Sequence, residues 1–198
     1  MLAIRIARIA IAGCIVVTLT PTQASAGSIR SGRLGMGDSV MLGAKPELRA
    51  RGFGVVDAVV SRQFYRAPAL VRYWRRQGRL PKDVVIHLGT NGTVNLTDCY
   101  HAVRAAGRRK VFLVNLKVPR SWRAEDNQRL RHCARHFLNA YLIDWYGHSH
   151  DHPGWFASDG YHLTGAGRIA YAALIKRGVA RHERSTRGDA HARTAGRR

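Results

Sequence analysis

Apolar and polar residues alternate along the chain in blocks whose lengths fit five strands and five helices. Short apolar runs typical of buried strands lie at 34–37, 55–60, 84–88, 110–116 and 141–144. Helical patterns follow at 39–51, where Pro46 starts a new first turn, and at 65–77, 96–106, 124–138 and 164–177. This alternation predicts one α/β domain whose parallel sheet is covered by helices on both faces.

The two ends of the chain depart from this pattern. Residues 1–26 combine two arginines, an apolar stretch at 9–19 and a small-x-small run at 24–26, which is typical of a secretory signal. A competing interpretation is a lipoprotein signal with Cys14 as the lipid-bearing residue, but the apolar run continues past Cys14 and favours release. We therefore expect a secreted or envelope-associated domain at 27–180, followed by a basic, disordered tail at 181–198.

The net charge is strongly positive, at +21 for the whole chain. Removal of residues 1–26, which hold Arg5, Arg8 and no acid, leaves +19. An exported protein with this charge is expected to associate with anionic polymers of the cell envelope through long-range attraction. For most individual arginines we prefer the simpler interpretation of an ordinary solvated surface. Nucleic-acid binding is a third interpretation, which the secretory signal and the lack of a nucleic-acid-binding motif disfavour.

Two cysteines, Cys99 and Cys133, remain after the predicted cleavage. An even pair in an oxidising compartment favours a disulfide, with two buried free thiols as the alternative. The histidines at 148, 150 and 152 could ligate zinc, but no cysteine or carboxylate accompanies them at a metal-ligand spacing. We therefore expect neither a metal nor another cofactor.

Candidate chemistry begins with Asp159 and His162, which one turn can hold side by side. The carboxylate can accept a hydrogen bond from one ring nitrogen, which leaves the other nitrogen free to take a proton from a nucleophile. Ser39, in the Gly-Asp-Ser run after the first strand, can supply that nucleophile. Asn91 lies in the Gly-Thr-Asn-Gly run after the third strand, and α/β folds place their sites at such strand ends.

Taken together, these runs resemble the SGNH (GDSL-type) hydrolase superfamily. The chain is most similar to the extracellular SGNH domains that accompany bacterial membrane acyltransferases and O-acetylate cell-surface glycans. The resemblance covers about 34–179 and is carried by the runs 37–44, 57–63, 84–92 and 159–164. The chain departs from the family pattern in two places: Ser61 stands where a glycine is usual, and Gly92 stands where an aspartate is usual.

The resemblance implies a three-layer α/β/α, flavodoxin-like fold with a central parallel sheet of about five strands. It implies that Ser39 is the nucleophile, that His162 is the base and that Asp159 orients the imidazole. It further implies an oxyanion hole made by the backbone N–H groups of Ser39 and Ser61 and the side-chain amide of Asn91.

Other residues near these runs are weaker candidates. Arg62 and Gln63 follow the second strand and are candidate substrate contacts. Trp155 could form a wall on which a sugar stacks, or could simply pack in the core. His87 lies within an apolar strand and is expected to be a buried, hydrogen-bonded histidine.

The function favoured by the resemblance is that of a secreted serine esterase acting on O-acyl, most simply O-acetyl, groups of envelope carbohydrates. One alternative is transfer of acetyl to a cell-wall glycan hydroxyl, with a membrane acyltransferase as the partner that supplies the acyl group. Another is a non-catalytic basic module that binds the envelope. We expect the protein to be monomeric.

Overall fold

The structure is a computed structural model that describes residues 32–195, with side chains described as far as residue 183. The predicted secretory signal and the alternative lipid attachment at Cys14 lie outside the described residues. Within the described part of the chain, no helix combines the length and the apolar character needed to cross a membrane.

Five parallel strands form one sheet, in the order β2-β1-β3-β4-β5. They are β1 (Arg33–Gly37), β2 (Phe53–Ala58), β3 (Asp83–His87), β4 (Lys110–Val114) and β5 (Ala140–Ile143). The central strand β3 is buried along its whole length, as expected for a strand covered on both faces. The predicted parallel sheet of about five strands is confirmed.

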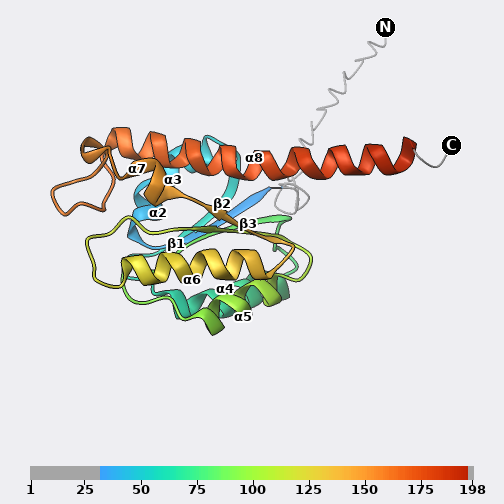
Figure 1. The fold of residues 1–198 in the computed structure, drawn as a ribbon, viewed down its shortest axis with the longest axis horizontal. Coiled ribbons are helices and arrows are strands. Elements are labelled where there is room, and N and C mark those ends of the chain that lie inside the picture. The colour runs from blue at the N-terminus through green and yellow to red at the C-terminus, as the bar shows by residue number, and fades with distance from the viewer. Residues whose placement is uncertain (1–31, 196–198) are drawn as a thin grey trace, which may run out of the picture.

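Helices cover both faces of this sheet and make a three-layer structure (Figure 1). On one face lie α2 (Ser39–Gly43), α3 (Lys45–Arg49), α7 (Trp145–Ser149) and α8 (Gly165–Ala195). The other face carries α4 (Ala67–Arg76), α5 (Leu96–Ala106) and α6 (Arg123–His136). Two single-turn segments complete the fold, η1 (Phe64–Arg66) and η2 (Pro153–Trp155).

Alternating strand residues supply the two hydrophobic cores. In β3, Val84 and Ile86 pack against the layer of α4, α5 and α6, whereas Val85 packs against α8 and its neighbours. Each hydrophobic core therefore contains the side chains from one face of the sheet. Packing on both faces holds the sheet between the two helical layers.

Some element boundaries differ from the predicted ones for local reasons. The second strand ends at Ala58, and Val59 and Val60, which we expected to continue it, are exposed in the following turn. The helix predicted at 65–77 begins as η1, and α4 starts only at Ala67, because Pro68 fits a first helical turn and not a helix interior.

The C-terminal region differs most from its prediction. We expected the last helix to end near 177 and a disordered tail to begin at 181, but α8 continues to Ala195 and projects beyond the sheet (Figure 1). The ring of His182 stacks on Tyr141 at 3.9 Å, and Glu183 accepts hydrogen bonds from Arg33 at 3.1 Å. The lack of apolar residues suggested disorder, yet aromatic and ionic contacts attach this part of the helix to strand residues.

A disulfide joins the two helices that lie side by side under the sheet. Cys99 of α5 bonds to Cys133 of α6, their Cα atoms are 6.3 Å apart, and both side chains are buried. The bond closes a loop with a sequence separation of 34. The pairing favoured by the sequence is therefore present in the structure.

We expect the double variant Cys99→Ala/Cys133→Ala to lose about 3–4 kcal/mol of stability, because the unfolded chain regains the freedom that this closed loop removes. Urea unfolding with and without a thiol reductant measures the effect. Reduction of the unmodified protein should lower its unfolding midpoint, and the midpoint of the double variant should not respond. A midpoint that is insensitive to reductant in both proteins would show that the bond contributes nothing.

Candidate active site

The candidate residues follow three neighbouring strands at the carboxyl edge of the sheet. Gly37, the last residue of β1, lies in register with Ala58 of β2 on one side and with His87 of β3 on the other. The loops that leave these strands therefore begin next to one another, as expected for the edge at which α/β folds bind ligands. They carry Ser39, Ser61 and Asn91 respectively.

Ser39 is the first residue of α2, and the buried carboxylate of Asp38 fixes this helix start. One carboxylate oxygen of Asp38 accepts the backbone N–H of Val40 at 3.0 Å, which makes Asp38 the N-cap. The other accepts the hydroxyl of Thr90 at 2.6 Å. Because Thr90 belongs to the loop after β3, this carboxylate joins two of the loops that form the site.

Close packing under the serine requires a glycine at position 37. A β-carbon at Gly37 would lie 2.4 Å from Cβ of Met41, which is closer than two carbon atoms can approach. Met41 is itself fully buried against the sheet. The glycine in Gly-Asp-Ser thus allows α2 to begin directly on the end of β1.

One turn holds Asp159 and His162 together, as the sequence predicted. One carboxylate oxygen of Asp159 accepts the backbone N–H groups of Tyr161 and His162 at 3.1 and 3.0 Å. The other lies 2.6 Å from Nδ1 of His162. The opposite ring nitrogen, Nε2, lies 2.9 Å from Oγ of Ser39. The structure thus brings together three side chains that are separated by up to 123 residues in the sequence.

The same contacts favour the charged form of Asp159. Burial is the largest single influence and raises the pKa of this carboxyl, but the hydrogen bonds from the His162 ring and from the two backbone N–H groups together outweigh it and lower the pKa below its usual value. Asp159 is therefore ionised at neutral pH and can both orient and stabilise a protonated imidazole at position 162.

Ser61 adopts the backbone conformation that favours glycine. Its φ is 60°, the only positive value among the described residues other than glycine. This explains why a glycine is usual here and why a serine can replace it, although at some conformational cost. Ser61 keeps its backbone N–H, the group that the predicted oxyanion hole requires.

An ion pair holds the loop that contains Ser61. The guanidinium of Arg62 donates to the backbone oxygen of Asp57 at 2.6 Å and to its carboxylate at 2.8 Å. The indole N–H of Trp74 donates to the other carboxylate oxygen at 2.9 Å. The Arg62 side chain is only 11% exposed. We expected Arg62 to meet the substrate, but its donors are directed at Asp57, and the ion pair instead anchors the loop to β2 and α4.

Asn91 retains a free donor in a buried position. Its amide nitrogen Nδ2 is buried and has no hydrogen-bond partner among the described residues. A buried amide without a partner is costly unless a ligand or reaction intermediate uses it. The neighbouring Gly92 lies against Gln63, because a β-carbon at position 92 would be 3.1 Å from the side-chain oxygen of Gln63. Gln63 therefore lies against the residue that follows Asn91, one of the candidate oxyanion donors.

Trp155 and His87 are both occupied by packing. The Trp155 ring stacks on His152 at 3.9 Å and lies parallel to Trp145 at 6.0 Å, so neighbouring rings cover the surfaces that a sugar would need. This favours the packing interpretation of Trp155. Nδ1 of His87 lies 2.7 Å from the hydroxyl of Tyr171, and burial lowers the pKa of His87. The expected buried, hydrogen-bonded role of His87 is confirmed.

The histidines after β5 turn to different neighbours. His148 lies beside Arg177, His150 pairs with Asp151 at 3.0 Å, and His152 stacks on Trp155. Their ring nitrogens do not converge, and no group of three potential metal ligands occurs within the described residues.

Two supporting interactions were not identified from the sequence. The Thr90–Asp38 hydrogen bond joins two of the recognised runs, and the Asp57–Arg62 ion pair lies within a third. Each involves a polar residue directly next to a candidate catalytic residue. That adjacency was the available signal, but one sequence does not tell which polar neighbours contact each other.

The sequence was compared with known proteins and structures. No family model matches the chain. The YrhL protein of Bacillus subtilis is 35% identical over 143 residues, which are 72% of this chain and 23% of YrhL. The peptidoglycan O-acetyltransferase OatA of Listeria monocytogenes is 32% identical over 141 residues, 71% of this chain and 22% of OatA. The chain thus spans less than a quarter of the length of these relatives.

A solved structure shares the fold. The C-terminal catalytic domain of the Streptococcus pneumoniae peptidoglycan O-acetyltransferase A superposes with a TM-score of 0.70 at 24% identity, over 78% of this chain and 96% of that domain. The sheet order, the three layers and the sequence matches together lead to one assignment. The chain belongs to the SGNH (GDSL-type) superfamily of hydrolytic enzymes and has its three-layer α/β/α fold.

Proposed function

We propose that this chain is a serine-dependent enzyme that acts on O-acetyl esters of envelope glycans through an acyl-enzyme at Ser39. The observation that carries the proposal is the hydrogen-bonded series from Asp159 to His162 to Ser39, with distances of 2.6 and 2.9 Å. An unassisted serine hydroxyl is a poor nucleophile, and a neighbouring base held by a carboxylate is the usual means of activating it.

The reaction would proceed in two steps. Ser39 Oγ attacks the ester carbonyl while Nε2 of His162 takes its proton, and the ionised Asp159 stabilises the imidazolium. The imidazolium then protonates the departing sugar oxygen, which leaves the acetyl group on Ser39. In the second step His162 takes a proton from water or from a glycan hydroxyl, and that oxygen attacks the acetyl carbonyl. The bond from the acetyl group to Ser39 Oγ then breaks, and His162 returns the proton to Oγ.

The negative charge of the tetrahedral intermediate needs donors that are already in position. Nδ2 of Asn91 is the best-supported donor, since it is buried and has no partner in the part of the chain that the structure describes. The backbone N–H groups of Ser39 and Ser61 complete the proposed oxyanion hole, the first at the start of a helix and the second in a loop held by the Asp57–Arg62 pair.

The glycan substrate is inferred from the relatives. The names of all three proteins described above include the term peptidoglycan O-acetyltransferase, and a cell-wall glycan ester fits that term. Our first proposal is hydrolysis of such esters. Transfer to a glycan hydroxyl is the second candidate, since it needs the same acyl-enzyme and differs only in the acceptor. In that case a membrane acyltransferase partner would supply the acyl group. Export through the predicted signal at 1–26 would bring the enzyme to this substrate.

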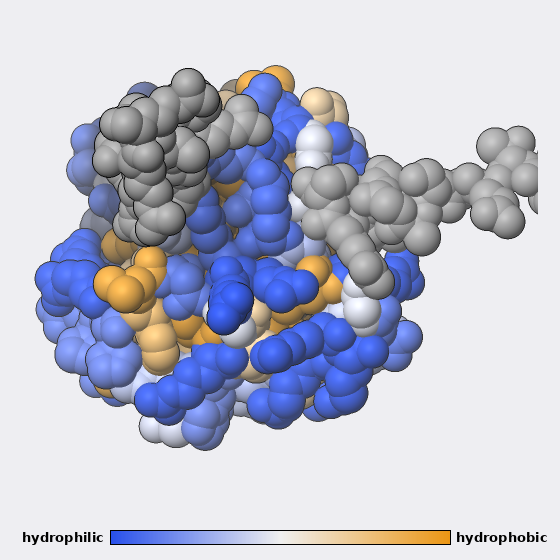
Figure 2. All heavy atoms as spheres, turned by 90° about the vertical axis from the view of Figure 1, so that its right-hand side faces the viewer, coloured by the Kyte–Doolittle hydropathy of each residue, from blue (hydrophilic) through white to orange (hydrophobic). Residues whose placement is uncertain are grey.

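The basic surface supports association with anionic envelope polymers, independently of catalysis. No acidic residue occurs at 58–82 or at 99–124. Viewed from the end at which α8 leaves the domain, the surface is mainly hydrophilic (Figure 2).

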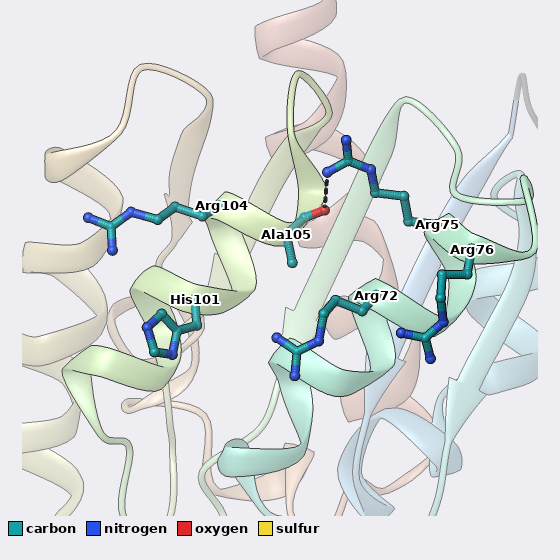
Figure 3. Close-up of a pocket in the computed structure, with 6 residues that line it drawn as sticks. All are labelled: Arg72, Arg75, Arg76, His101, Arg104 and Ala105. Carbon is teal, nitrogen blue, oxygen red and sulfur yellow. Dashed lines mark hydrogen bonds between the residues drawn. The ribbon is translucent and has the colours of Figure 1, made fainter.

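A cavity of about 790 Å³ between α4 and α5 is lined by Arg72, Arg75, Arg76, His101, Arg104 and Ala105. Arg72 and His101 lie on its facing sides (Figure 3). A non-catalytic envelope-binding module would use this surface alone.

Incubation with an acetyl ester and a glycan acceptor distinguishes the candidate functions. We expect free acetate to be the main product if water is the acceptor, and acetylated glycan if transfer dominates. Ser39→Ala should abolish both products, because the acyl-enzyme can no longer form. Products formed at the normal rate by a folded Ser39→Ala protein would exclude Ser39 as the nucleophile. If the folded, unmodified protein forms neither product, only the binding module is left.

Asn91→Ala should lower turnover by about 10²–10³-fold, the usual cost of losing one oxyanion donor. Steady-state kinetics on a soluble acetyl ester measure this, with circular dichroism to show that the variant is folded. Thr93→Ala, which changes an exposed residue of the same loop, serves as the matched control. Turnover by Asn91→Ala equal to that of the control would remove Asn91 from the oxyanion hole.

Ser61→Gly should keep turnover within about twofold, since glycine supplies the same backbone N–H. Its stability should be unchanged or higher by up to about 1 kcal/mol, because glycine tolerates a positive φ but makes the unfolded chain more flexible. Ester kinetics and urea unfolding test both expectations. A tenfold loss of turnover would show that the Ser61 side chain takes part and that its N–H alone does not suffice.

A further inference from the structure

A second cavity lies beside the candidate active site, beyond the ends of β4 and β5. Its volume is about 450 Å³. It is lined by residues 117–120 from the segment between β4 and α6, by Arg123 at the start of α6, by Tyr146 of α7 and by His150, which directly follows α7. Both parts of the lining follow the carboxyl ends of strands, as Ser39 and Asn91 do.

Two contacts connect this cavity to the candidate active site. A β-carbon at Gly160, between Asp159 and His162, would lie 3.8 Å from Cγ of Pro119 in the cavity wall. The indole of Trp122 donates to the backbone oxygen of Gly89 at 3.1 Å, which ties the cavity segment to the Asn91 loop. Two strand spacings separate β4 from β1, or roughly 10 Å. A substituent on the same or the next sugar ring can span that distance.

Aromatic rings hold the cations of this cavity in place. Nζ of Lys117 lies 4.9 Å from the centre of the Phe156 ring, and the guanidinium carbon of Arg123 lies 4.4 Å from the centre of the Tyr146 ring. Such contacts orient a cation without neutralising its charge. Lys117 is half-buried, so its position is more restricted than that of a free surface lysine.

The cavity contains few negative charges to balance these cations. Among residues 32–183, no ion pair involves Lys117, Arg120 or Arg123. Asp151, the acid beside His150, is paired with that histidine and is 79% exposed. Arg123 is also the first residue of α6, where the positive end of the helix disfavours a cation. An anion in this space would thus meet two cations that aromatic rings orient, Lys117 and Arg123, and a third cation, Arg120.

The high arginine content of the chain offers a simpler explanation, since cations are expected to meet by chance on so basic a surface. That explanation accounts for exposed arginines on helix faces, such as Arg131 and Arg135 of α6, which line a different cavity together with Glu125. It does not account for cations that aromatic rings orient around one cavity in contact with the His162 turn.

We propose that this cavity is a subsite for an anionic group, a carboxylate or a phosphate, carried by the glycan next to the acetyl ester. The inference rests on the proposed function and makes its substrate an acidic glycan. Lys117 and Arg120 would donate charge-assisted hydrogen bonds to the anion, and Arg123 would contribute to the positive potential around it.

Two matched pairs of sugars test the subsite. O-acetylated N-acetylmuramic acid differs from O-acetylated N-acetylglucosamine by one lactyl group, which carries a carboxylate. O-acetylated N-acetylglucosamine 1-phosphate differs from the same neutral sugar by one phosphate. We expect kcat/KM for at least one anionic ester to exceed that of the neutral ester. In Lys117→Met/Arg120→Gln this preference should fall roughly 10- to 100-fold, the usual effect of losing hydrogen bonds to a charged group. Arg131→Gln/Arg135→Gln, which removes the same charge from an exposed face, should retain it.

Binding of the sugars without an ester separates this proposal from the catalytic one. N-acetylmuramic acid or N-acetylglucosamine 1-phosphate should bind more tightly than N-acetylglucosamine in calorimetric titration. Lys117→Met/Arg120→Gln should remove the difference, and Arg131→Gln/Arg135→Gln should not. The anionic sugar with the larger gain in affinity over N-acetylglucosamine shows whether the subsite prefers a carboxylate or a phosphate. Equal affinity for all three sugars, or equal losses in the two variants, would overturn the subsite even if ester cleavage occurs. Selective binding without ester cleavage would overturn the proposed catalysis instead.

Discussion

The buried carboxylate of Asp38 is the contact on which the geometry of the candidate active site depends. Burying a charge is costly unless hydrogen bonds replace its water, and Asp38 receives them from Val40 N–H and from the Thr90 hydroxyl. The first bond fixes the start of α2, and hence the position of Ser39. The second fixes the loop that carries Asn91. One side chain therefore sets the relation between the candidate nucleophile and the main candidate oxyanion donor.

The remaining parts of the site are held in similar ways. The Asp57–Arg62 pair anchors the loop of Ser61, and the carboxylate of Asp159 organises its own turn before it orients His162. In each case a carboxylate accepts donors from the backbone or from a neighbouring loop. Fixed donors and acceptors of this kind are what preorganised catalysis requires, because they need not rearrange when charge develops. The parallel sheet contributes by bringing these loops to one edge.

Much of the fold and of the candidate site could be predicted from the sequence, because the signals were local or carried by the family resemblance. The apolar run of β3 and the spacing of Asp159 and His162 indicated both the sheet and the histidine–carboxylate pair. Contacts between distant residues could not be derived in this way. The role of Arg62 depended on Asp57 and Trp74, and the environment of Trp155 depended on two other rings. The attachment of His182 and Glu183 depended on contacts with strand residues.

The central claim is that His162 activates Ser39. Labelling with a serine-directed fluorophosphonate, followed by mass spectrometry of the peptides, tests it most directly, because the reagent reacts only with an activated serine. The account predicts one phosphonylated residue, Ser39, in the unmodified protein, and loss of that modification in a folded His162→Ala variant. A folded protein that remains unlabelled, or that is labelled at Ser39 equally well without His162, would contradict it.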